Sequence, residues 1–268
     1  FSYNVGVNFT TNKNEVTRIA NQNHYLNGPT GVLSQGTEYI YRAEEGKPIG
    51  YFYGMSYSGI FQNQAQIDQY NAQSLAAHPG LDKATWADAQ PGDCIWDDWN
   101  GDGVITYAEG ETCDRHEIGN PNPDVMLGVN LGFNWKGLDF AVNGAGAFGM
   151  QIMRSYRSFS DAPYQNYDTT IFNRWYGEGT SNDQPKISST GSPNTNYVST
   201  RYMEDADYFK IKTITLGYDF KNIWKSCPLQ QLRIYVQAQN LITFTGYTGL
   251  DPEVGNSAGG NGWASGVI

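Results

Sequence analysis

The sequence predicts an all-β chain of antiparallel strands, and three observations carry this prediction. Aromatic residues make up 14% of the chain and charged residues only 16%, with 19 Tyr and 31 Gly, a composition that favours strands and turns over helices. Apolar and polar residues alternate with period two over several segments, as they do in strands with two unlike faces. Short polar turns join some of these segments, and long Gly- and Asn-rich stretches separate others.

The alternation defines the expected strands in order. Residues 1–9, FSYNVGVNF, place an aromatic or aliphatic residue at every odd position, and LGVNLGFNW repeats the pattern after a long gap. In YFKIKTITLGYDF the phase slips between Ile211 and Ile214, which predicts a β-bulge. A two-residue turn, Lys136–Gly137, joins two of the strands. The expected strands are residues 1–9, 127–135, 138–143, 208–220 and 232–239.

Two architectures fit these strands. Short turns at one end, long loops at the other, strands of about nine to eleven residues and Trp or Tyr near strand ends are typical of an outer-membrane β-barrel. A soluble β-sandwich also alternates, but it does not usually need stretches as long as 20–124 and 150–207. No apolar run approaches the roughly 18 residues of a membrane helix. The pattern favours part of a large antiparallel transmembrane β-barrel and leaves the sandwich open.

One acidic stretch predicts a metal. The segment DWNGDGVITYAE fits the calcium-loop pattern D-x-[DN]-x-[DN]-G-x5-E at every fixed position, with Gly103 where the chain must turn. Oxygen ligands of this number suit a structural Ca²⁺ better than Mg²⁺. An ordinary acidic turn is the alternative. The expected ligands are the side chains of Asp98, Asn100 and Asp102, the backbone carbonyl of Val104, Thr106 directly or through water, and Glu109.

The flanks of this stretch argue against a calcium sensor. Pro91 and Gly92 break any helix upstream, and no helical period follows, whereas an EF-hand needs a helix on each side. The loop at about 91–118 is therefore expected to be a structural clip in an extended segment. Cys94 and Cys113 bracket it, either as a disulfide that staples its ends or as two small buried thiols.

Several functions are excluded on the residues. The net charge of −10 disfavours nucleic-acid binding. GAGAFG at 144–149 satisfies G-x-G-x-x-G, but no helix or βαβ pattern follows it. The three histidines lie in separate loops without a Ser or Cys constellation, so surface positions are expected. Neighbouring acids such as Asp97 and Asp98 point apart in an extended chain, which disfavours a glycosidase pair. The chain is not expected to be an enzyme.

Six ordered segments resemble the C-terminal part of SusC/RagA-type TonB-dependent transporters of Bacteroidetes-like bacteria. The resemblance covers most of the chain and is weakest at 20–45, 69–90 and 180–200. In that family the Asn-Gly-Asp-Gly stretch is a usual feature of an extracellular loop. The segments are GKPIGYFYGMSYSGIFQNQAQID (46–68), PGDCIWDDWNGDGVI (91–105), IGNPNPDVMLGVNLGF (118–133), NRWYGEG (173–179), RYMEDADYFKIKTITLGYDF (201–220) and LRIYVQAQNLITFTGYTGLDPEV (232–254).

The resemblance implies an energised importer in the bacterial outer membrane, with its long loops extracellular and its short turns periplasmic. Such barrels have about 22 strands and an N-terminal plug. A SusD-like surface lipoprotein caps the barrel and helps to capture glycans or peptides, and TonB pulls on the plug. Residues 1–268 are then expected to be a C-terminal segment without the plug, the TonB-contacting part or the final strand. Alone, such a segment is not expected to transport, because open sheet edges are not tolerated in lipid.

The sequence is compatible with alternative roles for its aromatic loops and with an alternative function. The Tyr- and Trp-rich loops can stack on sugars or grip peptides, or they can pack against one another or the lipoprotein; these residues include Tyr51, Tyr53, Tyr57, Trp96, Trp99, Tyr156 and Tyr164. The alternative to an importer is a secreted, calcium-stabilised β-rich binding or adhesion module, which would be a soluble, folded monomer.

Overall fold

The structure is a computed structural model, and it describes residues 1–28, 30–33, 36–154, 169–187 and 193–253. The chain divides into two compact units, each of which is described by itself. Of the described residues, the first unit, the strand unit, comprises those in Phe1–Asn14, Asn122–Ile152 and 204–253. The second, the loop unit, comprises those in Glu15–Pro121 and Met153–Met203.

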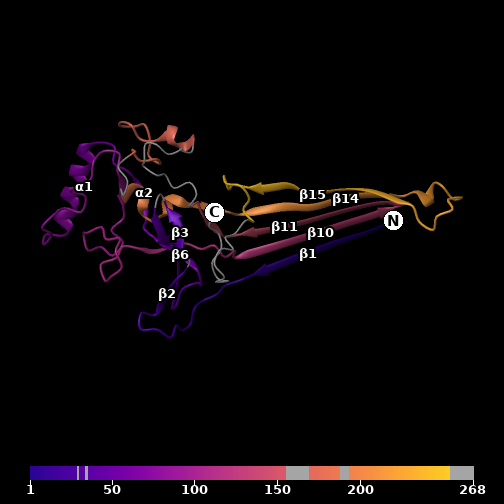
Figure 1. Cartoon of the computed structure of the whole chain (residues 1–268), viewed down its shortest axis with the longest axis horizontal. Helices are drawn as coiled ribbons and strands as arrows, with labels where there is room; N and C mark the ends of the chain where they lie inside the picture. Colours follow the sequence, from indigo (N-terminus) through magenta and orange to yellow (C-terminus); the bar gives the residue numbers. More distant parts are fainter. Residues whose placement is uncertain (29, 34–35, 155–168, 188–192, 254–268) are drawn as a thin grey trace. The chain divides into compact units, whose positions relative to one another are not determined.

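A five-stranded antiparallel sheet forms the strand unit (Figure 1). Its strands, in spatial order, are β1 (Ser2–Thr11), β10 (Val125–Trp135), β11 (Leu138–Phe148), β14 (Tyr208–Asp219) and β15 (Arg233–Thr245). All five expected strands are present, and β11 is longer than the alternation predicted. Lys136 and Gly137 join β10 to β11 with φ values of 48° and 92°. Positive φ at both positions gives the turn a twist that matches that of the paired strands.

The register sorts apolar and polar side chains onto opposite faces of the sheet. Across the five strands, Val5 lies opposite Leu131, Leu131 opposite Val142, Val142 opposite Ile214 and Ile214 opposite Ala238. One residue further along, a row of small and polar side chains crosses the other face: Gly6, Asn130, Asn143, Thr213 and Gln239. Many side chains on the apolar face are exposed, Phe9 by 66%. The sheet therefore has one uncovered apolar face and one polar face.

The predicted bulge in residues 208–220 is confirmed. The register of β14 against β15 shifts between Ile211 and Thr213, so the side-chain phase changes there. On the partner strand, Asn240 has a φ of 50°, a left-handed conformation that Asn tolerates better than most residues. The bulge keeps apolar residues on the same face at both ends of β14.

The loop unit contains more regular structure than the sequence indicated. Its irregular-looking stretches hold short strands and one 14-residue helix, α1, which Asn63 caps by accepting a hydrogen bond from the Gln66 N–H. Within the described ranges, no helix is both long and apolar enough to cross a membrane. The loop unit has a four-stranded sheet in the order β2 (Tyr25–Asn27), β5 (Tyr41–Glu44), β6 (Tyr51–Gly54) and β9 (His116–Gly119). Two further strand pairs are β3 (Thr30–Leu33) with β4 (Gly36–Tyr39), and β7 (Tyr57–Ile60) with β8 (Cys94–Trp96).

Helix α1 spans Gln64–Ala77. The remaining elements are short: β12 (Gln151–Met153), η2 (Thr169–Asn173), α2 (Pro193–Asn196), η3 (Thr200–Tyr202), β13 (Met203–Asp205) and η4 (Phe220–Asn222). The core of the loop unit forms around β5 and β6, where the rings of Tyr41 and Phe52 stack with centroids 5.1 Å apart. Ile118 from β9 and Val198 pack on the same cluster. Segments up to about 160 residues apart in sequence thus meet in this core.

Gly54 in β6 lies against the backbone of another segment. A Cβ added there would be 2.4 Å from the carbonyl oxygen of Val198, which accepts a hydrogen bond from the Met55 N–H. We expect Gly54→Ala to destabilise the loop unit by about 1–3 kcal/mol, because the backbone must shift to make room. Faster amide exchange in β6 and at Met55, measured by mass spectrometry, checks this. Gly80→Ala, with nothing within 4 Å of its added Cβ, is the control; equal effects at both positions would contradict the prediction.

Candidate functional site

The first half of the predicted calcium loop is folded around the carboxylate of Asp98. This carboxylate accepts hydrogen bonds from the backbone N–H groups of Gly101 at 2.8 Å, Asp102 at 3.1 Å and Gly103 at 2.7 Å. The two glycines have φ values of 71° and 85°, which L side chains rarely adopt. Asn100 lies within the same turn, and its amide donates to the Asp102 carboxylate at 3.1 Å. Three of the six predicted ligands therefore lie together.

Glu109, the predicted closing ligand, lies among other partners. Its carboxylate accepts hydrogen bonds from Arg42 Nη2 at 2.5 Å and Tyr25 Oη at 2.6 Å, and it pairs with Arg115 Nη2 at 3.1 Å. The backbone N–H of Thr106 donates to Asp114. In the part of the chain that the structure describes, no three His, Cys, Asp or Glu side chains gather as a metal site. The residues fit Ca²⁺ only in part, and calcium binding stays a prediction.

Asp114 closes the loop in this structure, a role that no sequence pattern indicates. Its carboxylate is fully buried and accepts hydrogen bonds from the backbone N–H groups of Trp99 at 2.9 Å, Asn100 at 3.3 Å and Thr106 at 2.7 Å. Burial raises the pKa of the Asp114 carboxyl, although these three donors act in the opposite direction. In the sequence, Asp114 is one more acidic residue just before β9, and a solvent-exposed Asp at that position would look the same.

Two buried arginines hold Glu109. The Arg42 guanidinium carbon lies 4.0 Å from the ring centroid of Tyr25 and 3.5 Å from that of Tyr53. That of Arg115 lies 4.8 Å from the Tyr53 centroid, and its Nη2 reaches the same glutamate oxygen as Arg42 Nη2. Burial alone would raise the pKa of Glu109, but the Tyr25 hydrogen bond and the two arginine charges lower it overall. Glu109 is therefore a carboxylate anchored by two cations.

No disulfide joins Cys94 to Cys113, so the disulfide alternative is wrong for this structure. Cys94 is buried in β8, and its backbone N–H donates to Asn194 Oδ1 at 2.9 Å. Cys113 Sγ lies 3.6 Å from Tyr53 Oη. Each thiol therefore packs against different neighbours. Cys227 is free as well.

The expectation of three surface histidines without a serine nearby is wrong for His116. Its Nε2 lies 2.9 Å from Ser56 Oγ, its Nδ1 lies 2.9 Å from the carbonyl oxygen of Asp114, and its ring stacks on Trp99 with centroids 3.6 Å apart. Burial lowers the pKa of His116. Pairing of β9 with β6 brings Ser56 to this histidine, and sequence spacing does not reveal such a contact.

Four of the seven loop aromatics that were candidates for cargo binding pack in or against the core of the loop unit. Tyr51, Tyr53 and Trp96 are buried, and Tyr57 packs against the cluster that contains Trp96, whereas Trp99 is exposed. Tyr156 and Tyr164 lie outside the described residues. Sequence reasoning can find aromatic-rich loops, but it cannot separate buried rings from accessible ones.

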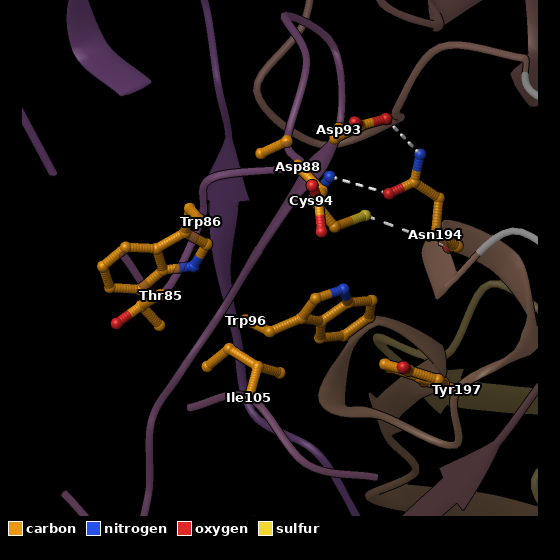
Figure 2. A pocket seen from close by; sticks show the side chains of 10 residues that line it. Thr85, Trp86, Asp88, Asp93, Cys94, Trp96, Ile105, Asn194 and Tyr197 are labelled. Carbon is orange, nitrogen blue, oxygen red and sulfur yellow. Dashed lines mark hydrogen bonds between the residues drawn. The ribbon is translucent and has the colours of Figure 1, made fainter. Parts of the chain in front are cut away.

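A cavity of about 430 Å³ lies beside Trp96 (Figure 2). Trp86, Trp96 and Tyr197 supply aromatic walls, and Asp93 and Asn194 lie at its polar side. Asn194 Nδ2 donates to Asp93 Oδ1 at 2.8 Å, and Lys186 Nζ lies 3.1 Å from the same oxygen. These polar groups already satisfy one another, so the cavity has no strong preference for one ligand chemistry.

Comparison with known proteins identifies the relatives of the chain. It is 28% identical over 255 residues to TonB-dependent receptor P3 of Formosa agariphila, a match that covers 94% of this chain and 23% of that protein. It is 24% identical over 256 residues to TonB-dependent receptor SusC of Bacteroides thetaiotaomicron, covering 95% of this chain and 22% of that protein. The chain is thus similar, along most of its length, to part of SusC and of other TonB-dependent receptors. No protein-family model matches it.

The solved structures agree with this relationship. The chain superposes on the RagAB peptide transporter with a TM-score of 0.68 at 22% identity, covering 99% of this chain and 25% of that one. The predicted fold class is thereby confirmed, since the antiparallel strand unit matches part of a TonB-dependent transporter barrel. The chain spans about a quarter of the length of these relatives. They are named as receptors or transporters, and none of these names is that of an enzyme.

Proposed function

We propose that this chain is part of an outer-membrane importer that takes up nutrient oligomers, glycans or peptides, with energy delivered through TonB. The observation that carries the proposal is the sheet with unlike faces in the strand unit. Its apolar face exposes large side chains, Phe9 and Val236 among them, to an extent that is rare on a water-soluble protein. A place in a barrel wall explains the exposed apolar side chains, because one face of such a wall meets lipid and the other lines the lumen.

The chain's similarity to SusC and to RagAB supports a SusD-like surface lipoprotein as the partner. The two-residue turn at Lys136–Gly137 then lies at the periplasmic end, and the loop unit lies outside the cell. RagAB, as its name states, is a peptide transporter. For this chain, glycans and peptides are both proposed cargo classes.

The test uses the full-length protein expressed in its own outer membrane with an affinity tag. Detergent is expected to be required for extraction, and a lipoprotein is expected to co-purify. A strain that lacks the gene is then grown on defined oligosaccharides or peptides as the sole nutrient. The nutrient on which this strain no longer grows identifies the cargo class. Release of the protein into the medium as a folded monomer would overturn the importer and favour the secreted adhesion module.

We further propose that Ca²⁺ stabilises the turn at Asp98, Asn100 and Asp102, with the Val104 carbonyl and Thr106 as further ligands, while Glu109 stays with Arg42 and Arg115. The dissociation constant is expected to be about 10⁻⁴–10⁻³ M, the range of extracellular calcium modules. Tb³⁺ luminescence sensitised by the exposed Trp99 within the loop measures this binding, with Ca²⁺ as competitor. Asp98→Asn is expected to weaken it at least tenfold by removing a ligand charge, and Asp88→Asn, at an exposed residue outside the predicted ligand set, serves as the control. Equal Tb³⁺ affinity in both variants would contradict a site at Asp98.

A further inference from the structure

We propose that Arg42 and Arg115 form a binding site for a carboxylate group, which Glu109 fills in this structure. The site lies wholly within the loop unit. Only for the source of an external carboxylate do we rely on the proposed import function: it would belong to an acidic cargo, either a peptide with a free C-terminus or a sugar acid.

The two arginines are fixed before any ligand arrives. Their side chains are only 7% and 5% exposed, yet a guanidinium stays charged at any physiological pH. Arg42 lies between the rings of Tyr25 and Tyr53, and its Nε donates to Asn27 Oδ1 at 3.2 Å. Arg115 lies near the rings of Tyr53 and Tyr107. Two buried cations held this closely need an anion, because a buried charge without a partner is strongly unfavourable.

The anion comes from the surface. Glu109 is 34% exposed, and it belongs to a run of exposed residues, 108–112. The arginines are thus part of the packed interior, whereas the carboxylate that neutralises them is carried by an exposed turn. An external carboxylate can approach from the side on which Glu109 now lies.

The donors around Glu109 match a carboxylate in kind and number. Arg42 Nη2, Arg115 Nη2 and Tyr25 Oη all reach its two oxygens, and Asn27 Nδ2 lies 3.4 Å from one of them. Arg115 Nε is buried and has no hydrogen-bond acceptor among the described residues, so one more donor is available. Guanidinium groups prefer planar anions and bind them through paired hydrogen bonds. An ammonium group or a neutral hydroxyl would leave the two positive charges uncompensated.

The test removes the internal carboxylate and supplies an external one. Glu109→Ala in the full-length, detergent-purified protein is expected to lower the thermal unfolding temperature and to increase amide exchange in β2 and β5. Sodium propionate is expected to restore both, because a ligand that binds only the folded state stabilises it by mass action. Propionamide and sodium chloride at equal ionic strength are expected to restore neither. The wild-type protein should respond little, because the tethered Glu109 has a high effective concentration.

Two arms distinguish the sources of the carboxylate. An acetylated dipeptide with a free C-terminus is compared with its amide, and glucuronate is compared with glucose. The acid that rescues Glu109→Ala at the lower concentration identifies the source, and equal rescue identifies a site for carboxylates in general. The double variant Glu109→Ala, Arg115→Gln is expected to lose the rescue, and the neighbouring exposed Glu111→Ala should need none.

The opposing explanation is a purely structural ion pair. Rescue by neither acid, or equal rescue by acid and amide, would overturn the proposal. If Glu109→Ala fails to fold, Glu109→Ser leaves the position of the carboxylate empty while keeping a small polar side chain, and it allows the same titrations; the same two results would then count against the site. Failure here is distinguishable from failure of the importer, because extraction and co-purification with the lipoprotein do not depend on Glu109.

Discussion

Replacement of Asp114 by alanine is expected to open the 98–114 loop. The substitution removes a fully buried carboxylate that accepts hydrogen bonds from the backbone N–H groups of Trp99, Asn100 and Thr106. Each buried donor left without an acceptor costs about 1–3 kcal/mol, and water entering the cavity offsets part of that. We expect local opening of the loop to become about 3–5 kcal/mol easier, which hydrogen exchange of the loop amides measures.

Asp114→Asn provides a graded comparison. It retains one acceptor oxygen and the approximate shape of the side chain, so a smaller effect is expected. The exposed Asp88, whose single ion pair is with Lys83, supplies the matched control as Asp88→Ala. Its effect should be close to zero, because exposed ion pairs contribute little. An exchange pattern in Asp114→Ala that matches that of Asp88→Ala would show that Asp114 does not hold the loop closed.

Replacement of Lys210 by methionine is expected to release the segment that follows β15. Lys210 Nζ lies 2.8 Å from Asp251 Oδ2 and 2.6 Å from Glu253 Oε2, and its side chain is only 4% exposed. Removing one partner of a buried ion pair costs about 3–5 kcal/mol, and about 2–3 kcal/mol is expected here because both acids keep partial contact with water. Faster amide exchange over residues 246–253, with less change in β14 itself, is the expected readout.

Lys212 offers the matched control for this prediction. It pairs with Glu253 alone, and its side chain is 37% exposed, so Lys212→Met should have a clearly smaller effect. Equal effects of the two methionine variants would mean that burial of the Lys210 charge contributes nothing to holding the segment.

The same cluster predicts a response to acid. Burial alone would raise the pKa of Glu253, but its hydrogen bonds with Lys210, Lys212 and Tyr208 lower it from 4.5 to about 2. A lowered pKa stabilises the folded form above about pH 4.5, and this contribution is lost as the pH falls toward 2. Protection of residues 246–253 from exchange, expressed relative to the intrinsic exchange rate at each pH, should therefore fall between pH 4.5 and 2 in the wild type, and less steeply in Glu253→Gln.

The strands of the strand unit were predictable because alternation of apolar and polar residues is a local pattern. Alternation over nine or more residues fixes which face each side chain takes, and a phase slip such as that at Ile211 marks a bulge without knowledge of the partner strand. The short strands and α1 of the loop unit were not predictable, since three- and four-residue strands carry too few positions to show a period. Their pairing depends on partners far away in the chain, as in β6 with β9.

The predicted calcium loop shows most clearly what depends on the sequence alone and what depends on the tertiary structure. The sequence by itself determined the all-β fold, the turn at Asp98 and the kinship with SusC-type receptors, because all of these depend on residue order and short spacings. Only the tertiary structure decided where Glu109 binds, since Arg42 lies 67 residues away and reaches it through β5. It likewise decided that Asp114 is buried and that Cys94 and Cys113 stay apart. Electrostatic partners and burial depend on distances through space, and sequence spacing does not contain those distances.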